Sequence, residues 1–279
     1  MSLWRAWLSS QREREKQKSR RRPRDRACSR AAGRSLWHRG RMAEPSRIRP
    51  RRVGHKGAAL LAPGNTLASF QAAVDAGVDM IEFDVLSEHR DGSGRLLLAH
   101  DYEDMHARTP MTFEQALEHL AGEEFAGVEL DVDVKIPGYG PRVVQALREA
   151  GLIERSLVSG MYVEELDTMR ALEPALRVGW SVPHLRRDYT TDMLTAIPAL
   201  VILSGYRALL PRRARAALQA GRFDAIMAHW RLVTGALVRA VAEGGGELYA
   251  WTVDDAAQIA RLSAMGVDAI ITNDPRLFG

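Results

Sequence analysis

Eight short runs rich in β-branched and aromatic residues alternate with amphipathic helical stretches from residue 53 to the C-terminus. Parallel strands need a crossover between them, usually a helix, so this alternation predicts an α/β fold. Eight strand–helix units predict a closed (β/α)8 TIM barrel. An open doubly wound sheet is the alternative, but no Gly-rich phosphate loop supports it. The strand candidates are VGHKG (53–57), MIEFDVL (80–86), VELDVDVK (128–135), SLVSG (156–160), RVGWSVP (177–183), AIMAHW (225–230), ELYAWTV (247–253) and DAIITND (268–274).

Two segments interrupt the alternation. Residues 86–101 contain the turn signal DGSG followed by an apolar run, which predicts a β-hairpin insertion after the second strand. The run PALVILSGY (198–206) has the composition of a strand, but periodicity does not separate a short strand from part of a buried helix. Because eight strands already close a barrel, we place this run in a long helical segment after the strand at 177–183.

Charge divides the chain into two parts. Residues 1–52 contain 18 Lys and Arg against four acids, whereas residues 53–279 contain 21 basic and 31 acidic residues. We therefore predict a disordered Arg-rich tail over 1–52 and one barrel over 53–279. The excess of 35 Arg over 4 Lys is also what a GC-rich coding sequence produces, without a function for the tail. Translation starting at Met42 would remove most of the tail. We expect no specific nucleic-acid partner, and at most a weak contact of the tail with anionic membranes.

The single cysteine, Cys28, cannot form an internal disulfide, which fits a reducing compartment. No run approaches the roughly 18 apolar residues that a transmembrane helix needs. The N-terminal MSLWRAWLSS is apolar too briefly to be the core of a secretory signal. We expect a cytoplasmic protein without a transmembrane segment.

Carboxylates are concentrated on one face of two predicted strands. Glu82 and Asp84 lie two residues apart in MIEFDVL, and VELDVDVK places Glu129, Asp131, Asp133 and Lys135 on one side. Two like charges about 4 Å apart repel by roughly 4 kcal/mol at an effective dielectric constant near 20, so such a cluster needs a cation. The pattern predicts a divalent metal site.

Further polar residues fall where predicted strands end. His55 and Lys56 end the first strand, His100 ends the hairpin, and Trp251 lies in the penultimate strand. In a parallel barrel, functional residues gather at the C-terminal ends of the strands. We therefore expect these side chains to share one mouth of the barrel with the carboxylates.

The motifs GHKG, APGNTLASFQAAVDAGVDMIEFDV, LLLAHD, DVDVK, YAWTV and GVDAIITNDP occur in this order, from about Val53 to Phe278. As an ordered set they resemble the glycerophosphodiester phosphodiesterases. The resemblance implies a (β/α)8 barrel with a hairpin insertion, and hydrolysis of a glycerophosphodiester to sn-glycerol 3-phosphate and an alcohol. It also implies Mg²⁺ or Ca²⁺ as cofactor. Carried over by residue, it implies His55 and His100 as general acid and base, and Glu82, Asp84 and Asp133 as metal ligands.

The residue chemistry agrees with these roles. Carboxylate oxygens suit the hard cations Mg²⁺ and Ca²⁺, and a dication helps to neutralise a phosphoryl transition state. Histidine exchanges protons near neutral pH. The remaining substrate-binding candidates are Lys56, Asn65, Lys135 and Trp251. A glycerol hydroxyl or a water molecule can be the nucleophile, and the sequence leaves both routes open.

The chain departs from the family pattern at three positions. The usual Arg of His-Arg-Gly is Lys56, the usual Glu of Pro-Glu-Asn-Thr is Gly64, and the usual Glu before the Lys is Asp133. The changes to Lys56 and Gly64 together fit the loss of one contact between an Arg and a Glu. All three leave the reaction class standing and put substrate preference and metal affinity in question.

Each candidate has a structural alternative. Glu82 and Asp84 can form ion pairs with lysines instead of holding a metal, and Asp131 can replace Asp133 as the third ligand. Trp251 fits simple barrel packing as well as a wall for the glycerol moiety. His229 either lines the mouth or packs in the core. The histidines that we place on the surface are His89, His106 and His119.

Two alternative functions remain. The same site can act on lysophospholipids in the manner of a lysophospholipase D, which needs an apolar surface for the acyl chain. Apolar residues that can supply it are Trp180, Leu185, Ile197, Val201, Ile202 and Leu203. A non-catalytic binder of phosphodiesters or anionic surfaces is the other alternative.

Overall fold

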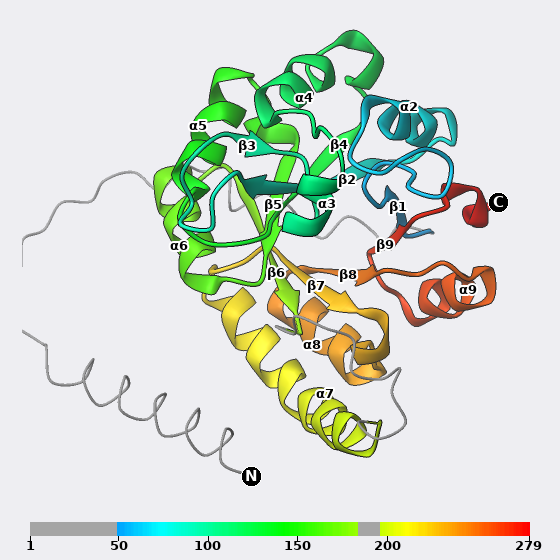
Figure 1. Cartoon of the computed structure of the whole chain (residues 1–279). Coiled ribbons are helices and arrows are strands. Elements are labelled where there is room, and N and C mark those ends of the chain that lie inside the picture. Colours follow the sequence, from blue (N-terminus) through cyan, green and yellow to red (C-terminus); the bar gives the residue numbers. More distant parts are fainter. Residues whose placement is uncertain (1–48, 184–195) are drawn as a thin grey trace, which may run out of the picture. The chain divides into compact units, whose positions relative to one another are not determined.

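The computed structural model describes residues 49–183 and 196–279, with the side chains of the second range described from residue 204. Eight parallel strands follow one another around a closed barrel, because β1 pairs with both β9 and β2 (Figure 1). This confirms the predicted (β/α)8 barrel. Its strands are β1 (Arg51–Gly54), β2 (Met80–Ser87), β4 (Glu129–Val134), β5 (Ser156–Gly160), β6 (Arg177–Val182), β7 (Ala225–His229), β8 (Glu247–Trp251) and β9 (Ala269–Thr272).

Apart from α3, the helices lie outside the strands (Figure 1). Several begin at the polar caps visible in the sequence, such as Thr66, Thr112 and Asp255, each of which accepts a hydrogen bond from a first-turn N–H. They are α2 (Leu67–Asp75), α3 (Tyr102–Ala107), α4 (Phe113–Leu120), α5 (Gly140–Glu149), α6 (Val163–Leu172), α7 (Ala196–Gln219), α8 (Gly235–Gly244) and α9 (Ala256–Met265). Short 3-10 turns are η2 (Glu123–Phe125), η3 (Ile153–Arg155), η4 (Trp230–Leu232) and η5 (Pro275–Phe278).

The two irregular segments are arranged as predicted. β3 (Leu96–Leu97) pairs antiparallel with β2, which confirms the hairpin insertion. Residues 198–206 lie inside α7, which confirms the helical placement. The sequence analysis did not anticipate α3, a short helix that begins directly after the hairpin and is capped by Asp101.

Strand alternation separates two apolar layers. Ile81, Phe83 and Val85 face outward into the large core between strands and helices. A smaller cluster that includes Val53, Met80, Leu157 and Tyr249 fills the barrel interior. The even-numbered residues of β2, Glu82 and Asp84, therefore share the interior face with Met80.

An ion-pair network lies at the N-terminal ends of the strands. Arg51, Glu129, Arg177 and Glu247 are each the first residue of β1, β4, β6 and β8. Arg51 donates to Glu247 at 2.9 Å, and Arg177 donates to Glu129 at 3.0 Å and to Glu247 at 2.6 Å. Arg51 and Arg52, which the sequence analysis grouped with the basic tail, thus belong to the barrel. The rest of that tail, up to residue 48, lies outside the described residues.

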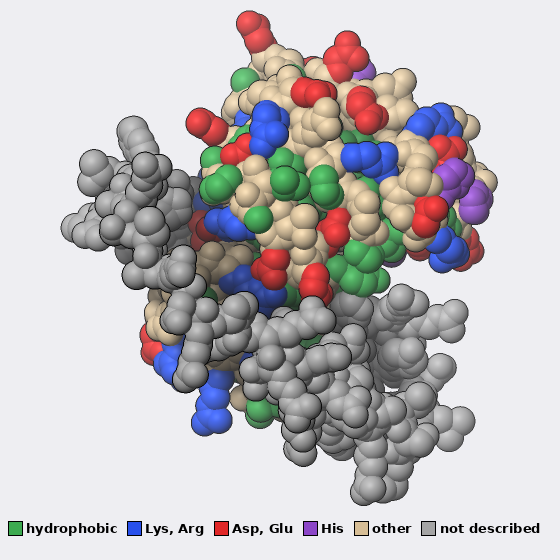
Figure 2. All heavy atoms as spheres, turned by 90° about the vertical axis from the view of Figure 1, so that its left-hand side faces the viewer, with side chains coloured by type: hydrophobic (Ala, Val, Ile, Leu, Met, Phe, Trp, Pro, Cys, Tyr) green, Lys and Arg blue, Asp and Glu red, His purple; other side chains and the backbone are tan. Residues whose placement is uncertain are grey.

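On the part of the surface that Figure 2 shows in colour, acidic and basic side chains are mixed. Neighbouring ion pairs such as Arg148–Glu173 and Arg222–Asp167 fit this pattern. Within the described ranges, no helix has both the length and the apolar character needed to cross a membrane.

Candidate active site

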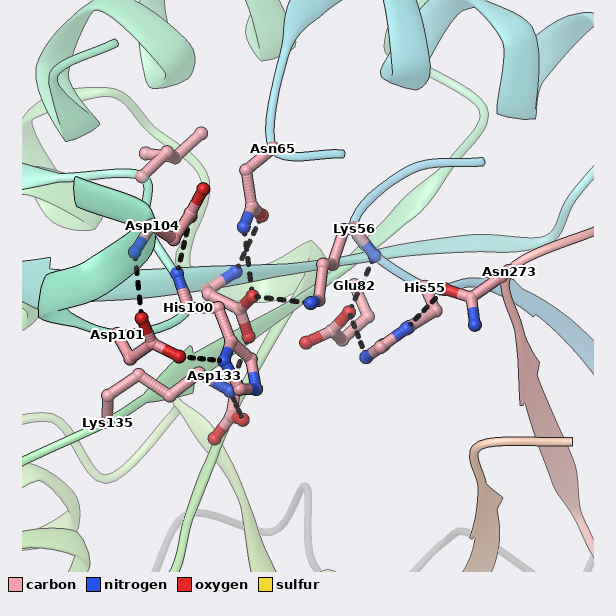
Figure 3. A network of polar contacts seen from close by, with 12 residues as sticks. His55, Lys56, Asn65, Glu82, His100, Asp101, Asp104, Asp133, Lys135 and Asn273 are labelled. Carbon is pink, nitrogen blue, oxygen red and sulfur yellow. Dashed lines mark hydrogen bonds and ion pairs between the residues drawn. The ribbon is translucent and has the colours of Figure 1, made fainter. Parts of the chain in front are cut away.

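The sequence-predicted polar residues come together at the C-terminal mouth of the barrel, opposite the ion-pair network (Figure 3). His55 lies next to Glu82 and Asn273, and His100 lies next to Asp101. The residues come from β2, from the end of β4 and from the loops that follow β1, β3 and β4: His55, Lys56, Asn65, Glu82, Asp84, His100, Asp133 and Lys135.

Three carboxylates converge at the centre of this mouth. Glu82, Asp84 and Asp133 each offer one oxygen, and these oxygens lie within 4.8 Å of one another. Parallel pairing of β2 with β4 places Asp84 directly opposite Asp133. Glu82 and Asp84 are buried, whereas the Asp133 side chain is 20% exposed. Burial and the neighbouring Asp84 charge raise the pKa of Glu82 well above its usual value.

Asp84 is the most heavily bonded of the three. Its carboxylate accepts from the Asn65 amide at 2.9 Å, and Asn65 accepts from the Asp84 backbone N–H at 3.0 Å. Lys135 forms a close ion pair with the other carboxylate oxygen. Burial alone would raise the pKa of Asp84, but Lys135 and Lys56 lower it far below its usual value. Asp84 therefore forms an ion pair with a lysine, as the sequence analysis considered, and it is also one of the three carboxylates that converge.

The two lysines of the mouth differ in how they are held. Lys135 lies 2.5 Å from Asp133 and also pairs with Asp84, so its donors are engaged by carboxylates. Although burial opposes it, these carboxylates raise the pKa of Lys135 well above its usual value. Lys56 reaches Asp84 only at 3.9 Å, beyond hydrogen-bonding distance, with a side chain that is 23% exposed. Its ammonium remains available to an anionic ligand.

The loop after β1 holds Lys56 through its backbone. Lys56 has a left-handed φ of 52°, its N–H donates to Glu82 at 2.8 Å, and its carbonyl accepts from Asn65 N–H at 3.0 Å. A Cβ added to Gly64 would lie 3.0 Å from Lys56 Cβ and 3.2 Å from Lys56 Cδ. The missing side chain at position 64 thus leaves the space that the Lys56 stem fills. This contact joins two of the three positions at which the sequence departs from the family pattern.

His55 lies in a restricted environment beside the carboxylates. Its Nδ1 is 2.7 Å from Asn273 Oδ1, and its Nε2 is 3.8 Å from Glu82 Oε2. The side chain is 19% exposed. Burial lowers the pKa of His55 to about 4, so the ring is neutral at pH 7.

His100 is more open and is held from the start of α3. Its Nδ1 lies 3.0 Å from Asp101 Oδ2, and its backbone N–H donates to Asp104 at 3.1 Å. Half of the His100 side chain is exposed. Asp101 also caps α3 by accepting from Asp104 N–H at 2.9 Å, so one carboxylate fixes both the helix start and the imidazole.

Asp131, the alternative third ligand, lies one interior position deeper along β4. Only 1% of the residue is exposed, and neither carboxylate oxygen has a hydrogen-bond partner of good geometry. Burial raises the pKa of Asp131 to about 7. It is not one of the three carboxylates whose oxygens converge, which favours Asp133 as the third ligand.

Trp251 and His229 lie at the ends of β8 and β7, which pair with each other. Their rings meet edge to face with centroids 5.3 Å apart, and Trp251 Nε1 donates to the Met227 carbonyl at 2.9 Å. Both residues are half-buried, so each packs against the barrel and still has an exposed surface at the mouth. The three histidines assigned to the surface, His89, His106 and His119, are exposed.

Sequence reasoning missed the residues that hold the two histidines. Asn273 and Asp254 support His55, and Asp101 and Asp104 support His100. Asn273 and Asp254 follow β9 and β8, the same C-terminal positions that drew attention to the other candidates. Their position at strand ends was the signal that could have found them.

The model of the glycerophosphoryl diester phosphodiesterase family matches residues 55–103 and 106–277. A glycerophosphodiester phosphodiesterase from Caldanaerobacter subterraneus subsp. tengcongensis is 24% identical over 80% of this chain and 93% of its own length. A solved glycerophosphodiester phosphodiesterase from Agrobacterium tumefaciens superposes with a TM-score of 0.59 at 19% identity, covering 82% of this chain and 98% of that one.

An Oleispira antarctica phosphodiesterase, solved with its product sn-glycerol-3-phosphate, superposes with a TM-score of 0.56 at 19% identity, covering 82% of this chain and 95% of that one. At this identity the two solved structures show a shared fold, and the family match over most of the chain shows the reaction class. The chain belongs to the glycerophosphoryl diester phosphodiesterase family, and it is a phosphoric diester hydrolase.

Proposed function

We propose that this enzyme hydrolyses glycerophosphodiesters to sn-glycerol 3-phosphate and an alcohol, with a divalent metal and two histidines. One observation carries the proposal: three converging carboxylates, the loosely paired ammonium of Lys56 and two differently held imidazoles share the mouth of the barrel. The product in the Oleispira antarctica structure supports the same substrate class.

The donor set fits a hard dication. Glu82, Asp84 and Asp133 offer only oxygen, which suits Mg²⁺ or Ca²⁺ and gives little hold on softer metals. Two lysines, Lys135 and Lys56, face four carboxyl groups, these three and the buried Asp131, and burial and like charges raise the pKa values of Glu82 and Asp131. A bound dication would favour the ionised form of all four. The bound cation would supply charge stabilisation for a phosphate oxygen in the transition state.

His55 is the proposed general base. Its ring is neutral at pH 7, and Nε2 faces the carboxylate side of the mouth while Nδ1 contacts Asn273. A neutral imidazole whose Nε2 carries a lone pair can accept the proton of an attacking hydroxyl. The attacking group is either the glycerol hydroxyl next to the phosphate or water.

His100 is the proposed general acid. Its Nδ1 bonds to Asp101, so a positive charge on the ring would be compensated, and its open position leaves Nε2 for a leaving group. When the P–O bond to the alcohol breaks, the departing oxygen takes a proton from His100. In this assignment the reacting phosphate would lie between His55 and His100.

The remaining candidates bind and orient. Lys56 would donate to a phosphate oxygen, since its ammonium lies 3.9 Å from Asp84, beyond hydrogen-bonding distance. Asn65 would hold Asp84 in place, and Lys135 would fix Asp84 and Asp133. Trp251 would offer its exposed ring surface to the glycerol moiety.

Release of glycerol 3-phosphate from glycerophosphocholine and glycerophosphoethanolamine tests the proposal. We expect turnover by the wild-type chain and a loss of kcat by at least about 100-fold in His55→Gln and in His100→Gln, with native circular dichroism. Unchanged turnover in both variants would reject the acid–base assignment. No turnover of either substrate by the wild-type chain would reject the substrate class.

The lysophospholipid alternative keeps the same site. Most of its apolar candidates, Leu185, Ile197 and residues 201–203, lie outside the described side chains. The remaining one, Trp180, stacks on Phe223 with centroids 5.7 Å apart, which is a packing contact. Leu60, 63% exposed in the loop that also holds Lys56, is the apolar surface that favours this alternative. Comparing rates on lysophosphatidylcholine and glycerophosphocholine separates the two substrates.

A cytoplasmic location and a weak contact of the basic tail with anionic membranes remain inferences from the sequence. The single cysteine supports the first and the arginine content supports the second. Tail-driven binding of anionic vesicles would depend strongly on salt and disappear on deletion of residues 1–41.

A further inference from the structure

Two residues to which the sequence analysis gave no role form a chain of hydrogen bonds to His55. Asn273, in the loop after β9, places Oδ1 2.7 Å from His55 Nδ1 (Figure 3). On its other side, Asn273 Nδ2 donates to Asp254 Oδ2 at 2.6 Å. Asp254 lies in the loop after β8, so three neighbouring strands contribute to this chain.

The direction of each hydrogen bond follows from its partner. A carboxylate accepts and does not donate, so the amide NH₂ of Asn273 must face Asp254. The amide oxygen of Asn273 then faces His55, and an amide oxygen only accepts hydrogen bonds. His55 Nδ1 must therefore carry the proton, which leaves the lone pair of the neutral ring on Nε2.

Asp254 is itself held in place. Its Oδ1 accepts from Thr272 Oγ1 at 3.0 Å and from Asn273 N–H at 2.8 Å. The backbone ties the same loops together, since Thr272 O accepts from His55 N–H at 2.8 Å and Asn273 O accepts from Leu60 N–H at 3.0 Å. The Asn273 amide is thus fixed at both ends.

We infer that Asp254 and Asn273 are positioning residues that select the Nδ1–H tautomer of His55 and aim its Nε2 lone pair into the mouth. The role in turnover rests on the proposed function, whereas the tautomer itself does not. The amide transmits an orientation from Asp254 to the ring, as the orienting partner of a catalytic imidazole does in other hydrolytic sites.

The tautomer can be read without any substrate. In protein labelled with ¹⁵N-histidine at pH 8, long-range ¹H–¹⁵N spectra distinguish a protonated Nδ1 from a protonated Nε2. His55→Gln identifies the signals of His55 among the eight histidines. We expect a protonated Nδ1 in the wild type and a mixture of tautomers in Asn273→Leu. A wild-type His55 protonated on Nε2 would overturn the inference.

Turnover of glycerophosphoethanolamine supplies the second readout. Asn273→Leu should lower kcat by about 10- to 100-fold, the usual cost of losing the partner that orients a functional imidazole, with a much smaller change in KM. Asp274→Asn is the matched control, since Asp274 lies in the same loop but pairs with Arg276. We expect the control to keep the wild-type kcat and tautomer.

Asp254→Asn keeps the size of the side chain and frees the Asn273 amide to turn over, so it tests the inference if Asn273→Leu does not fold. We expect mixed tautomers and a kcat between those of the wild type and Asn273→Leu. Wild-type tautomer and kcat in every folded variant would overturn the inference. A wild-type chain with the expected tautomer and no turnover would reject the proposed function alone.

Discussion

The residues that the family pattern names lie in a predicted strand or in the segment that follows it, which is why the sequence could point to them. It could not point to their partners, because the contacts join distant parts of the chain. Asn273 reaches His55 across 218 positions, and a strand-end Asn or Asp carries no mark of what it contacts. Lys56 and Gly64 both depart from the family pattern, which indicates a contact between the two positions. The space between them depends on how the loop folds and cannot be read from the sequence.

A test at position 64 follows from this contact. Gly64 does not need a left-handed φ, so its function is space rather than backbone freedom. Gly64→Glu would place a carboxylate beside Lys56 and draw its ammonium from the phosphate. We expect KM for glycerophosphoethanolamine to rise by roughly 10-fold, the value of one charged hydrogen bond, and to recover in Lys56→Arg/Gly64→Glu.

The matched control is Gly127→Glu, because Gly127 is exposed and a Cβ there would have no neighbour within 4 Å. Equal increases in KM in Gly64→Glu and in this control would attribute the effect to net charge. If KM does not recover in Lys56→Arg/Gly64→Glu, and the effects of the two single substitutions simply combine, residues 56 and 64 do not form a matched contact.

The buried His55 ring also predicts how the stability of the metal-free protein depends on pH. In the folded chain its pKa is about 4, and in the unfolded chain it returns to about 6.5. Between these values the unfolded state binds the additional proton, so stability falls as pH falls from 6.5 towards 4. The slope from this group is at most about 1.4 kcal/mol per pH unit.

Urea unfolding at pH 7 and pH 5 in the presence of EDTA measures this dependence. His55→Gln should lose less stability than the wild type over the same interval, because it lacks the titrating ring. An equal or larger loss in the variant would contradict the low pKa of His55.

At the scale of elements, the alternation of strands and helices was predictable because the hydrophobic period and the cap residues indicate the same helix positions. The hairpin was predictable from DGSG, and Gly92 and Gly94 there adopt positive φ as such a turn requires. α3 was not predictable, since six residues are too few for a clear helical period. Its cap, Asp101, is in the sequence only the last residue of the motif LLLAHD.

Asp101→Ala tests this double role. The variant loses the cap of α3 and the partner of His100 Nδ1 together. We expect stability to fall by about 1 kcal/mol, the usual cost of a lost N-cap, and kcat to fall as well. Thr112→Ala removes the cap of α4 without touching a histidine, and it should lower stability without lowering kcat.

Urea unfolding and glycerol 3-phosphate release measure the two effects. A kcat in Asp101→Ala equal to that of Thr112→Ala would contradict a role for Asp101 in holding His100.

At the scale of the whole molecule, the residues that stabilise the barrel and the residues proposed to react lie at opposite ends of its strands. Charged residues close its N-terminal end, and the reactive groups occupy the C-terminal end. The sequence grouped Arg51 with a basic tail, because composition does not reveal that a strand has begun. In the barrel, Arg51 is buried and bonded to Glu247 and Tyr249.

Glu247→Leu would leave Arg51 and Arg177 without a shared partner. Removal of one member of a buried ion pair costs 3–5 kcal/mol, and the 33% exposure of the Glu247 side chain reduces this to about 2 kcal/mol. We expect this loss in urea unfolding and an unchanged KM for glycerophosphoethanolamine, because the network lies at the other end. A stability equal to that of the wild type would contradict a stabilising network.

The dependence of turnover on a dication tests the central claim most directly. Glycerol 3-phosphate release from glycerophosphoethanolamine is measured with the full chain in Mg²⁺ or Ca²⁺, then in EDTA, and again after either cation is restored. The three carboxylates of the mouth predict that turnover stops in EDTA and returns with one of the cations. Turnover that continues at the same rate in EDTA would contradict a metal-dependent site.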